Sequence, residues 1–349
     1  MVHANVNSVG KKRNLPTLRA KIEKVMTKII KNRLGDLPTF VTDYLGMALA
    51  LAGLIVFFSI KAENFFTLTT FRTIANQVPD ITIVAVGMTF VLIIAGIDLS
   101  VGSVMALAGA VLGLGLIEWN FPLAVAIVAC LLVGVLCGAL NGLVVIGWRL
   151  PSFIVTLGML EIARGAAYIV TDSRTIYIGG PVEVISETSV LGLSLPFIIA
   201  VIIVAAGQLV LSRTVFGRYL IAIGTNEEAV RLSGIDPRPL KLAVFVLCGV
   251  LTSVAAVIHT ARLSSADPNA GYGLELQAIA AVVIGGTSLM GGRGSVVSSF
   301  FGVLIIAVLG TGLAQIGAQE STKRVITGCV IVAAVILDHY RHRIRRREK

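Results

Sequence analysis

A short polar stretch, AGIDLSVGS at residues 95–103, separates two long apolar runs. It places a carboxylate, Asp98, and two hydroxyls, Ser100 and Ser103, among glycines. Such groups can bind a polar solute or the exposed N–H groups at the start of a helix. An ionised carboxylate at the centre of a lipid-facing helix costs about 3 kcal/mol on insertion scales. The stretch is therefore expected to face protein or a water-filled space. Its candidate residues are Asp98, Leu99, Ser100, Gly102 and Ser103.

A second stretch of this kind, GGTSLMGGRGS at residues 285–295, follows an apolar run too short for a complete membrane span. A run of that length indicates a broken or re-entrant helix. Both stretches have an apolar segment, glycines, a short polar turn with Leu and Ser, and then a helix of small residues. Paired glycine breaks, one in each half of a chain, indicate a transport site between internal repeats. The second break adds Gly285, Gly286, Thr287 and Ser288 to the candidate path.

Further polar residues lie inside apolar runs. Asn141 is interpreted as an interhelical hydrogen-bond partner or, alternatively, as an amide that faces a pore. Thr156 can donate to a solute or to its own helix backbone. Glu161 and Arg164 stand three residues apart and are expected to pair on one helix face. Gly134, Gly138 and Gly142, at four-residue steps, predict close helix packing.

No pattern of catalytic residues is present in the sequence. It contains no GxxxxGK[ST] phosphate loop, no HExxH and no G-x-S-x-G. The four cysteines lie in apolar runs without metal-binding spacing, which favours packing roles. We expect no enzyme activity, cofactor or metal in this chain. If transport is driven by ATP, another subunit must bind the nucleotide.

The elements that would position these residues are long and apolar. The chain has 349 residues, of which 56% are hydrophobic and only 14% are charged, which predicts an all-α polytopic membrane protein. About ten transmembrane helices in two pseudo-repeated halves are expected. The candidate runs are 41–60, 80–96, 101–117, 122–147, 152–171, 196–211, 241–261, 276–290, 296–316 and 324–338.

The net charge of +10 is concentrated at the two ends of the chain. Residues 1–37 hold nine Lys/Arg and two acidic residues, and residues 339–349 hold six Lys/Arg and one acidic residue. Basic tips on an apolar body follow the positive-inside rule and exclude a nucleic-acid-binding face. Both termini are therefore placed in the cytoplasm. Arg262, Lys323 and Arg324 depart from this pattern, because they fall on the outer side.

Three segments make up the predicted domain organisation. Residues 1–40 form a basic cytoplasmic segment, in which residues 15–30 alternate apolar and basic positions as in an amphipathic helix on membrane lipid. A disordered basic tail is the alternative. Residues 41–338 form the transmembrane domain, and residues 339–349 form a basic cytoplasmic tail.

The longest cytoplasmic connection, residues 212–240, contains GTNEEAVRLSGIDP. Asn226 is a good N-cap, Glu227 and Glu228 favour the first turn, and Gly234 suits a left-handed C-terminal position. A two-turn helix is marginal alone and must dock on something. A partner's groove is favoured over packing on its own protein. The docking residues are Asn226, Glu227, Glu228, Ala229, Arg231, Leu232, Ser233 and Gly234.

These segments together resemble the ribose/xylose/galactoside branch of the permeases of ATP-binding-cassette (ABC) transporters. The likeness lies in residues 85–111, 150–176, 224–235 and 278–305, and covers about residues 40–340 in order. The resemblance implies a ten-helix permease like those of vitamin B12 importers, in a bacterial inner membrane. It also implies a second permease copy or a related permease, a periplasmic sugar-binding protein and an ATP-binding subunit that carries ATP and Mg. The helix at 224–235 would be the coupling helix seated on that subunit.

With this family in view, three roles for Asp98 remain open. It caps the helix that starts near Leu99, or it contacts the sugar, or it pairs with Arg164 or Arg293. The functional alternatives are a secondary transporter driven by an ion gradient and a scaffold subunit without a path. The former would need buried carboxylates, for which Asp98 and Glu161 are the candidates; the paired glycine breaks argue against the latter.

Overall fold

The structure, a computed structural model, describes residues 39–190 and 192–347. The chain divides into two compact units, residues 1–48 and 49–349. The predicted amphipathic helix at 15–30 and almost all of the predicted segment 1–40 lie outside the described residues. Their binding to membrane lipid therefore stays a prediction.

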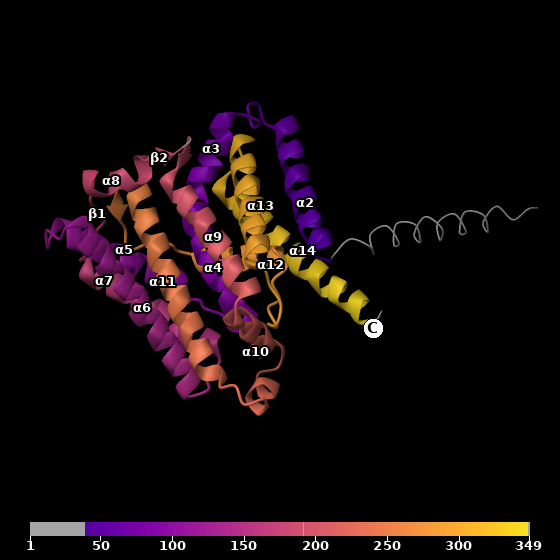
Figure 1. Cartoon of the computed structure of the whole chain (residues 1–349). Coiled ribbons are helices and arrows are strands. Elements are labelled where there is room, and N and C mark those ends of the chain that lie inside the picture. The colour runs from indigo at the N-terminus through magenta and orange to yellow at the C-terminus, as the bar shows by residue number, and fades with distance from the viewer. Residues whose placement is uncertain (1–38, 191, 348–349) are drawn as a thin grey trace, which may run out of the picture. The chain divides into compact units, whose positions relative to one another are not determined.

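The described residues are almost entirely helical (Figure 1). Two small antiparallel sheets, β1 (Ile176–Tyr177) with β4 (Ser265–Ala266) and β2 (Ser189–Val190) with β3 (Leu193–Ser194), lie between helices. The helices are α2 (Thr39–Lys61), α3 (Leu68–Gln77), α4 (Pro79–Ile93), α5 (Val101–Ile117), α6 (Leu123–Gly147), α7 (Ser152–Val170), α8 (Gly180–Glu187), α9 (Leu195–Arg213), α10 (Val215–Leu232), α11 (Pro237–Leu263), α12 (Leu274–Ile284), α13 (Val296–Gln315) and α14 (Glu320–Arg347).

Each of the ten predicted apolar runs is the main part of one helix, but ten membrane spans are not confirmed. Within residues 39–190 and 192–347, six helices are long and apolar enough to cross a membrane. The pair α3 and α4 qualifies as a seventh span, bent by 48°. Two further apolar helices, α5 and α12, fall short because the glycine breaks limit their length. The fold is that of a polytopic membrane protein with broken helices.

The pairing of α6 with α11 shows why this chain uses so many glycines (Figure 1). A Cβ added to Gly134 would lie 2.1 Å from the Gly249 carbonyl, and one on Gly138 would lie 2.4 Å from the Phe245 carbonyl. The prediction of close helix packing at these glycines is confirmed. On α6, leucines recur at exposed positions: Leu132, Leu136, Leu140 and Leu143. A helix with one glycine-lined buried face and one exposed leucine face is suited to a lipid environment.

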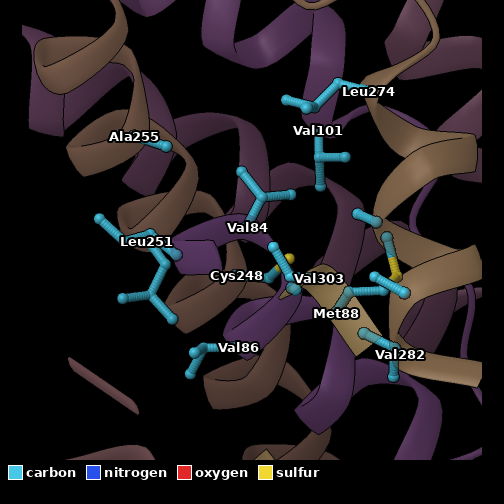
Figure 2. Packing of buried hydrophobic residues seen from close by; sticks show 14 of the residues in the cluster. Val84, Val86, Met88, Val101, Cys248, Leu251, Ala255, Leu274, Val282 and Val303 are labelled. Atoms are coloured by element: carbon cyan, nitrogen blue, oxygen red, sulfur yellow. The ribbon is translucent and has the colours of Figure 1, made fainter. Parts of the chain in front are cut away.

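Helix α4 lies at the centre of the buried core. Figure 2 shows Val84 and Met88 of α4 among Cys248 of α11, Val282 of α12 and Val303 of α13. A Cβ on Gly87 would lie 3.1 Å from the Cα of Cys248, so α4 and α11 approach closely. The helix that enters the first break is thus held on several sides.

The basic residues that depart from the positive-inside pattern have acidic partners. Arg262 pairs with Asp80, and both Lys323 and Arg324 lie against Glu320. The Lys323 ammonium that contacts Glu320 holds the pKa of that carboxyl below its ordinary value. Local pairing therefore compensates the charges of these three residues.

The cysteines agree with the sequence prediction at three of four positions. Cys130, Cys137 and Cys248 are buried, as expected for small packing residues. Cys329 is exposed, so the packing role predicted for it is wrong.

Candidate functional site

The first break is the non-helical segment between α4 and α5. Asp98 is buried there, and its Oδ1 accepts hydrogen bonds from the Ser100 backbone N–H (2.9 Å) and from the Ser100 hydroxyl (2.6 Å). The following helix begins at Val101 and not near Leu99 as predicted. Asp98 thus stabilises the turn that precedes the helix, because Ser100 occupies the N-cap position.

Two side chains of α7 fix the backbone of this break. Ser152 Oγ accepts from the Ile97 N–H (2.8 Å), and Thr156 Oγ1 accepts from the Leu99 N–H (3.0 Å). Thr156 Oγ1 also lies 2.9 Å from the Ser152 carbonyl of its own helix. Polar groups of a non-helical backbone need such partners at membrane depth. Thr156 was predicted from the sequence, but Ser152 was not. The only signal for Ser152 was its place four residues earlier on the same helix.

A hydrogen bond from α6 completes the arrangement. Asn141 Nδ2 donates to Ser100 Oγ (3.0 Å), and Ser100 in turn donates to Asp98. The interhelical hydrogen bond favoured for Asn141 is therefore present. Asn141 Oδ1 and Ser103 Oγ are buried without a hydrogen-bond partner. These two oxygens give the first break unused capacity to bind hydrogen-bonding groups.

Arg164 does not contribute to the first break as an ion-pair partner. Its guanidinium donates to the carbonyls of Pro268 and Ala270 (2.9 Å for the latter), in the loop that precedes α12. The predicted pair with Glu161 is wrong for the same reason, and Glu161 is exposed. The loop held by Arg164 packs onto α5, since a Cβ on Gly102 would lie 2.2 Å from the Gly271 carbonyl.

The second break, between α12 and α13, is shaped by glycines. Gly286, Gly291 and Gly292 have φ of +83°, +79° and +75°, a backbone conformation that residues with a Cβ rarely adopt. Ser288 stabilises the turn, because its N–H donates to the Arg293 carbonyl (3.0 Å) and its hydroxyl accepts from the Met290 N–H (3.2 Å). Gly285 lies directly against α13, because a Cβ added to it would lie 2.5 Å from the Ser298 carbonyl oxygen. The Thr287 hydroxyl is buried without a partner.

The two breaks meet each other and a third segment, the part of α10 that precedes residue 226. The Gly292 N–H donates to the Ile93 carbonyl (2.9 Å). A Cβ on Gly224 would lie 1.8 Å from that carbonyl oxygen and 2.4 Å from the Gly292 nitrogen. A Cβ on Gly291 would lie 2.9 Å from the Ala95 nitrogen. We call Ile93, Ala95, Gly224, Gly291 and Gly292 the junction; the sequence did not predict that they meet.

The predicted docking helix forms the last part of α10. The chain kinks at Asn226 (φ −162°, ψ 96°), whose Oδ1 accepts from the Ala229 N–H (3.0 Å), and Gly234 has φ +87°. The predicted N-cap and left-handed glycine are confirmed. The residues before the kink are also helical, however, so most of the predicted connection 212–240 is not a loop. Pro237 begins the next helix, α11.

Ion pairs and exposure distinguish the faces of this helix. Glu227 pairs with Lys241 (3.0 Å) and Glu228 with Arg231 (2.7 Å). Val230 is buried, while the Leu232 residue is 79% exposed. Ser233 donates to the Val230 carbonyl and closes the helix. An open pocket of about 750 Å³ lies beside the helix and is lined by Val145, Arg149, Glu227, Arg231 and Lys241, among others.

Known permease proteins are similar to this chain over most of its length. Residues 70–335 match the family described as branched-chain amino acid transport system / permease component. The chain is 40% identical to a ribose import permease of Haemophilus influenzae, over 84% of this chain and 92% of that protein. It is 32% identical to a fructose import permease of Rhizobium meliloti, over 82% of each chain. It is 36% identical to a D-allose transport system permease of Escherichia coli, over 81% of this chain and 87% of that protein.

No solved structure matches the chain. The family match covers most of the transmembrane domain, including both breaks and the docking helix. The relatives are permease subunits, which are transport components and not enzymes. The chain therefore belongs to this family of ABC-importer permeases.

Proposed function

We propose that this chain is the membrane subunit of an ATP-driven, binding-protein-dependent importer for a monosaccharide or polyol. The relatives that carry ribose, fructose and allose in their names support the solute class. The observation that carries the proposal is the junction. It connects two glycine breaks in the membrane domain to the segment that leads into the docking helix.

The docking helix would couple the permease to the ATP-binding subunit. Leu232 is exposed at its end, which leaves an apolar group for a partner's groove. The permease itself would carry no cofactor, since ATP and Mg would be bound by that subunit. Closing of two ATP-binding subunits would displace the docking helices, and the junction would pass this movement to both breaks.

The transport path would lie on a face that a second permease subunit covers. Glu161 on α7 and Gln277 on α12 are exposed at positions within apolar helices, and Tyr272 is 83% exposed just before α12. Polar groups facing lipid are costly, so these residues need a protein or aqueous neighbour. A second copy or a related permease would provide it. A periplasmic sugar-binding protein would deliver the solute from the outer side, with both termini in the cytoplasm.

The exposure and hydrogen bonds of two carboxylates argue against the alternative function, an ion-driven carrier. Glu161 is exposed, and Asp98 is occupied by Ser100. A transported ion would therefore meet either an exposed carboxylate, at Glu161, or a carboxylate whose Oδ1 already accepts two hydrogen bonds, at Asp98.

The test compares two leucine variants of the full chain, purified from its own membrane. Leu232→Ala removes the exposed apolar group of the docking helix, while Leu132→Ala makes the same change on the exposed face of α6. We expect an ATP-binding subunit to co-purify with the wild type and with Leu132→Ala, and to be reduced at least fivefold with Leu232→Ala. When the complete complex is reconstituted in proteoliposomes, uptake of labelled ribose, fructose or allose should require ATP and Mg on the side of the membrane that carries the ATP-binding subunit. Uptake by the chain alone, driven by a proton or sodium gradient, would overturn the proposal.

A further inference from the structure

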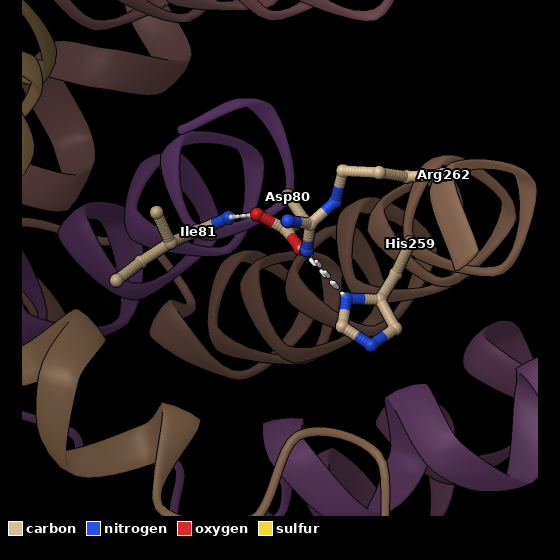
Figure 3. Close-up of polar contacts among 4 residues, drawn as sticks. All are labelled: Asp80, Ile81, His259 and Arg262. Carbon is tan, nitrogen blue, oxygen red and sulfur yellow. Dashed lines mark hydrogen bonds and ion pairs between the residues drawn. The ribbon is translucent and has the colours of Figure 1, made fainter. Parts of the chain in front are cut away.

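Three charged or titratable side chains meet where α4 begins and α11 ends (Figure 3). Asp80 Oδ2 lies 2.7 Å from His259 Nδ1 and 2.7 Å from an Arg262 terminal nitrogen. The other carboxylate oxygen, Oδ1, accepts from the Ile81 N–H (2.8 Å). The Asp80 side chain is 8% exposed, against 18% for His259 and 31% for Arg262. We call these three residues the clamp.

The chemistry of the clamp defines its hydrogen bonds. An ionised carboxylate can only accept, so His259 Nδ1 must carry a proton and donate to Asp80. The 3.2 Å approach of Arg262 to His259 Nδ1 is then a contact between two donors. Asp80 receives donors from three sides, as a buried charge requires.

The clamp also fits the helix dipoles. Asp80 lies in the first turn of α4, where a negative charge is favourable, and Arg262 lies in the last turn of α11, where a positive charge is favourable. The two helix ends therefore attract each other even before the specific hydrogen bonds are considered. The attraction joins segments that are 182 residues apart.

The opposite ends of the same two helices lie at the junction, for α4, and next to the docking helix, for α11. Helix α4 ends at Ile93, the junction residue whose carbonyl accepts from Gly292. Helix α11 begins at Pro237, directly after the docking helix, with Asp236 as its N-cap. From Asp236 to the clamp, α11 spans about 35 Å at 1.5 Å per residue. Between the ends, Gly87 of α4 packs closely on Cys248 of α11.

We propose that the clamp makes α4 and α11 move as one body. Displacement of the docking helix would then reach the first break through the junction and also through α11 and α4. Without the clamp, the outer end of α11 could separate from the start of α4, because the two helices would then be joined by apolar packing such as that of Gly87 on Cys248. Asp80, His259 and Arg262 are thus positioning residues for coupled transport. This inference rests on the proposed function, since it assumes ATP-driven movement of the docking helix.

The experiment uses proteoliposomes that contain the complete importer complex. It measures how much labelled ribose, fructose or allose, whichever the wild-type complex takes up, is transported per ATP hydrolysed. Asp80→Asn and Arg262→Gln each remove one charge of the clamp. Arg262→Lys keeps the charge, and His259→Asn keeps a donor near the position of Nδ1. We expect the two charge-removing variants to lower the uptake-to-hydrolysis ratio at least tenfold while ATP hydrolysis stays within twofold of wild type. The two conservative variants should keep at least half of the wild-type ratio.

The unfolding temperature of each variant separates coupling from simple stability. If Asp80→Asn does not fold, Arg262→Gln decides the question, because Arg262 is the most exposed member. An unchanged ratio, or a fall in uptake and hydrolysis by the same factor together with a lower unfolding temperature, would overturn the clamp proposal alone. A wild-type complex whose uptake does not depend on ATP would overturn the proposed function and the clamp with it.

Discussion

The two breaks differ in what holds them. The first is fixed by side chains, since Ser152, Thr156 and Asn141 reach it from two neighbouring helices. The second is held mainly by close backbone approaches at Gly285, Gly291 and Gly292 and by local contacts of Ser288. One side chain of a neighbouring helix also reaches its end, because Gln208 Oε1 of α9 accepts from the Ser295 hydroxyl (3.1 Å) and the Val296 N–H (2.9 Å). The hydroxyl of Thr287 in the second break has no hydrogen-bond partner, whereas the hydroxyl of Thr156, which reaches the first break from α7, has several.

This difference predicts different sensitivities. A segment held by hydrogen bonds is weakened when donors or acceptors are removed, because buried backbone groups are then left unpaired. A segment held by glycine contacts tolerates changes in polarity but not added volume. The junction, where the second break touches the first, should therefore be the part of the molecule most sensitive to a single methyl group.

The largest effect is expected for Gly224→Ala. The added methyl would overlap the Ile93 carbonyl and the Gly292 nitrogen, which are backbone atoms and cannot rotate away. We expect a loss of about 3 kcal/mol or more in the free energy of unfolding, and at least a tenfold loss of uptake. Gly165→Ala is the matched control, because nothing lies within 4 Å of its added Cβ. Thermal unfolding and uptake are measured for both, and similar values for the two variants would contradict the junction.

The next effect tests the first break through an isosteric change. Thr156→Val removes the acceptor of the Leu99 N–H and should cost about 1–3 kcal/mol, because that N–H is left without a partner. Thr156→Ser retains the hydroxyl and should recover most of the loss. Chemical unfolding of the purified chain measures both. Equal stability of the Val and Ser variants would show that the hydroxyl does not hold the break.

Asp98 provides a smaller effect that separates its charge from its hydrogen bonds. Asp98→Asn retains an acceptor for the Ser100 N–H and hydroxyl, so we expect a loss of about 1 kcal/mol or less and near-normal uptake. Asp98→Ala removes both bonds and should cost more. Uptake and unfolding are compared between the two. An Asn variant as inactive as the Ala variant would mean that the charge itself is required for transport.

The smallest effect is expected at Thr287. Thr287→Val replaces a buried hydroxyl that has no partner with a methyl group, so the change should be neutral or slightly stabilising, within about 0.5 kcal/mol. The same substitution at Thr156 is its natural comparison. A clear loss of uptake with unchanged stability would instead show that the Thr287 hydroxyl contacts the solute.

The sequence predicted the local features of this protein well. Apolar runs predicted the helical segments, because the length and hydrophobicity of a helix are local properties. The cap at Asn226 and the left-handed Gly234 followed from residue preferences at helix ends. Helices α3 and α8, both small sheets and the helical part of α10 before the kink were missed, because they are short and their patterns are weak.

Contacts between distant segments were beyond local patterns. Arg164 was assigned to Glu161, its nearest acidic neighbour on the helix, but it binds two carbonyls more than 100 residues away. Asp80, His259 and Arg262 gave no joint signal, although Asp80 at a helix start and a basic pair three residues apart at a helix end were visible separately.

The sequence by itself determined the membrane class, the helical segments, the two glycine breaks and the capped docking helix. Residue type and spacing are sufficient for these, because each depends on interactions within a few turns of chain. Only the tertiary structure decided that the two breaks meet Gly224 and that α11 returns to Asp80. Such contacts depend on how whole helices pack, and the small residues that allow a close approach do not specify which backbone will approach them.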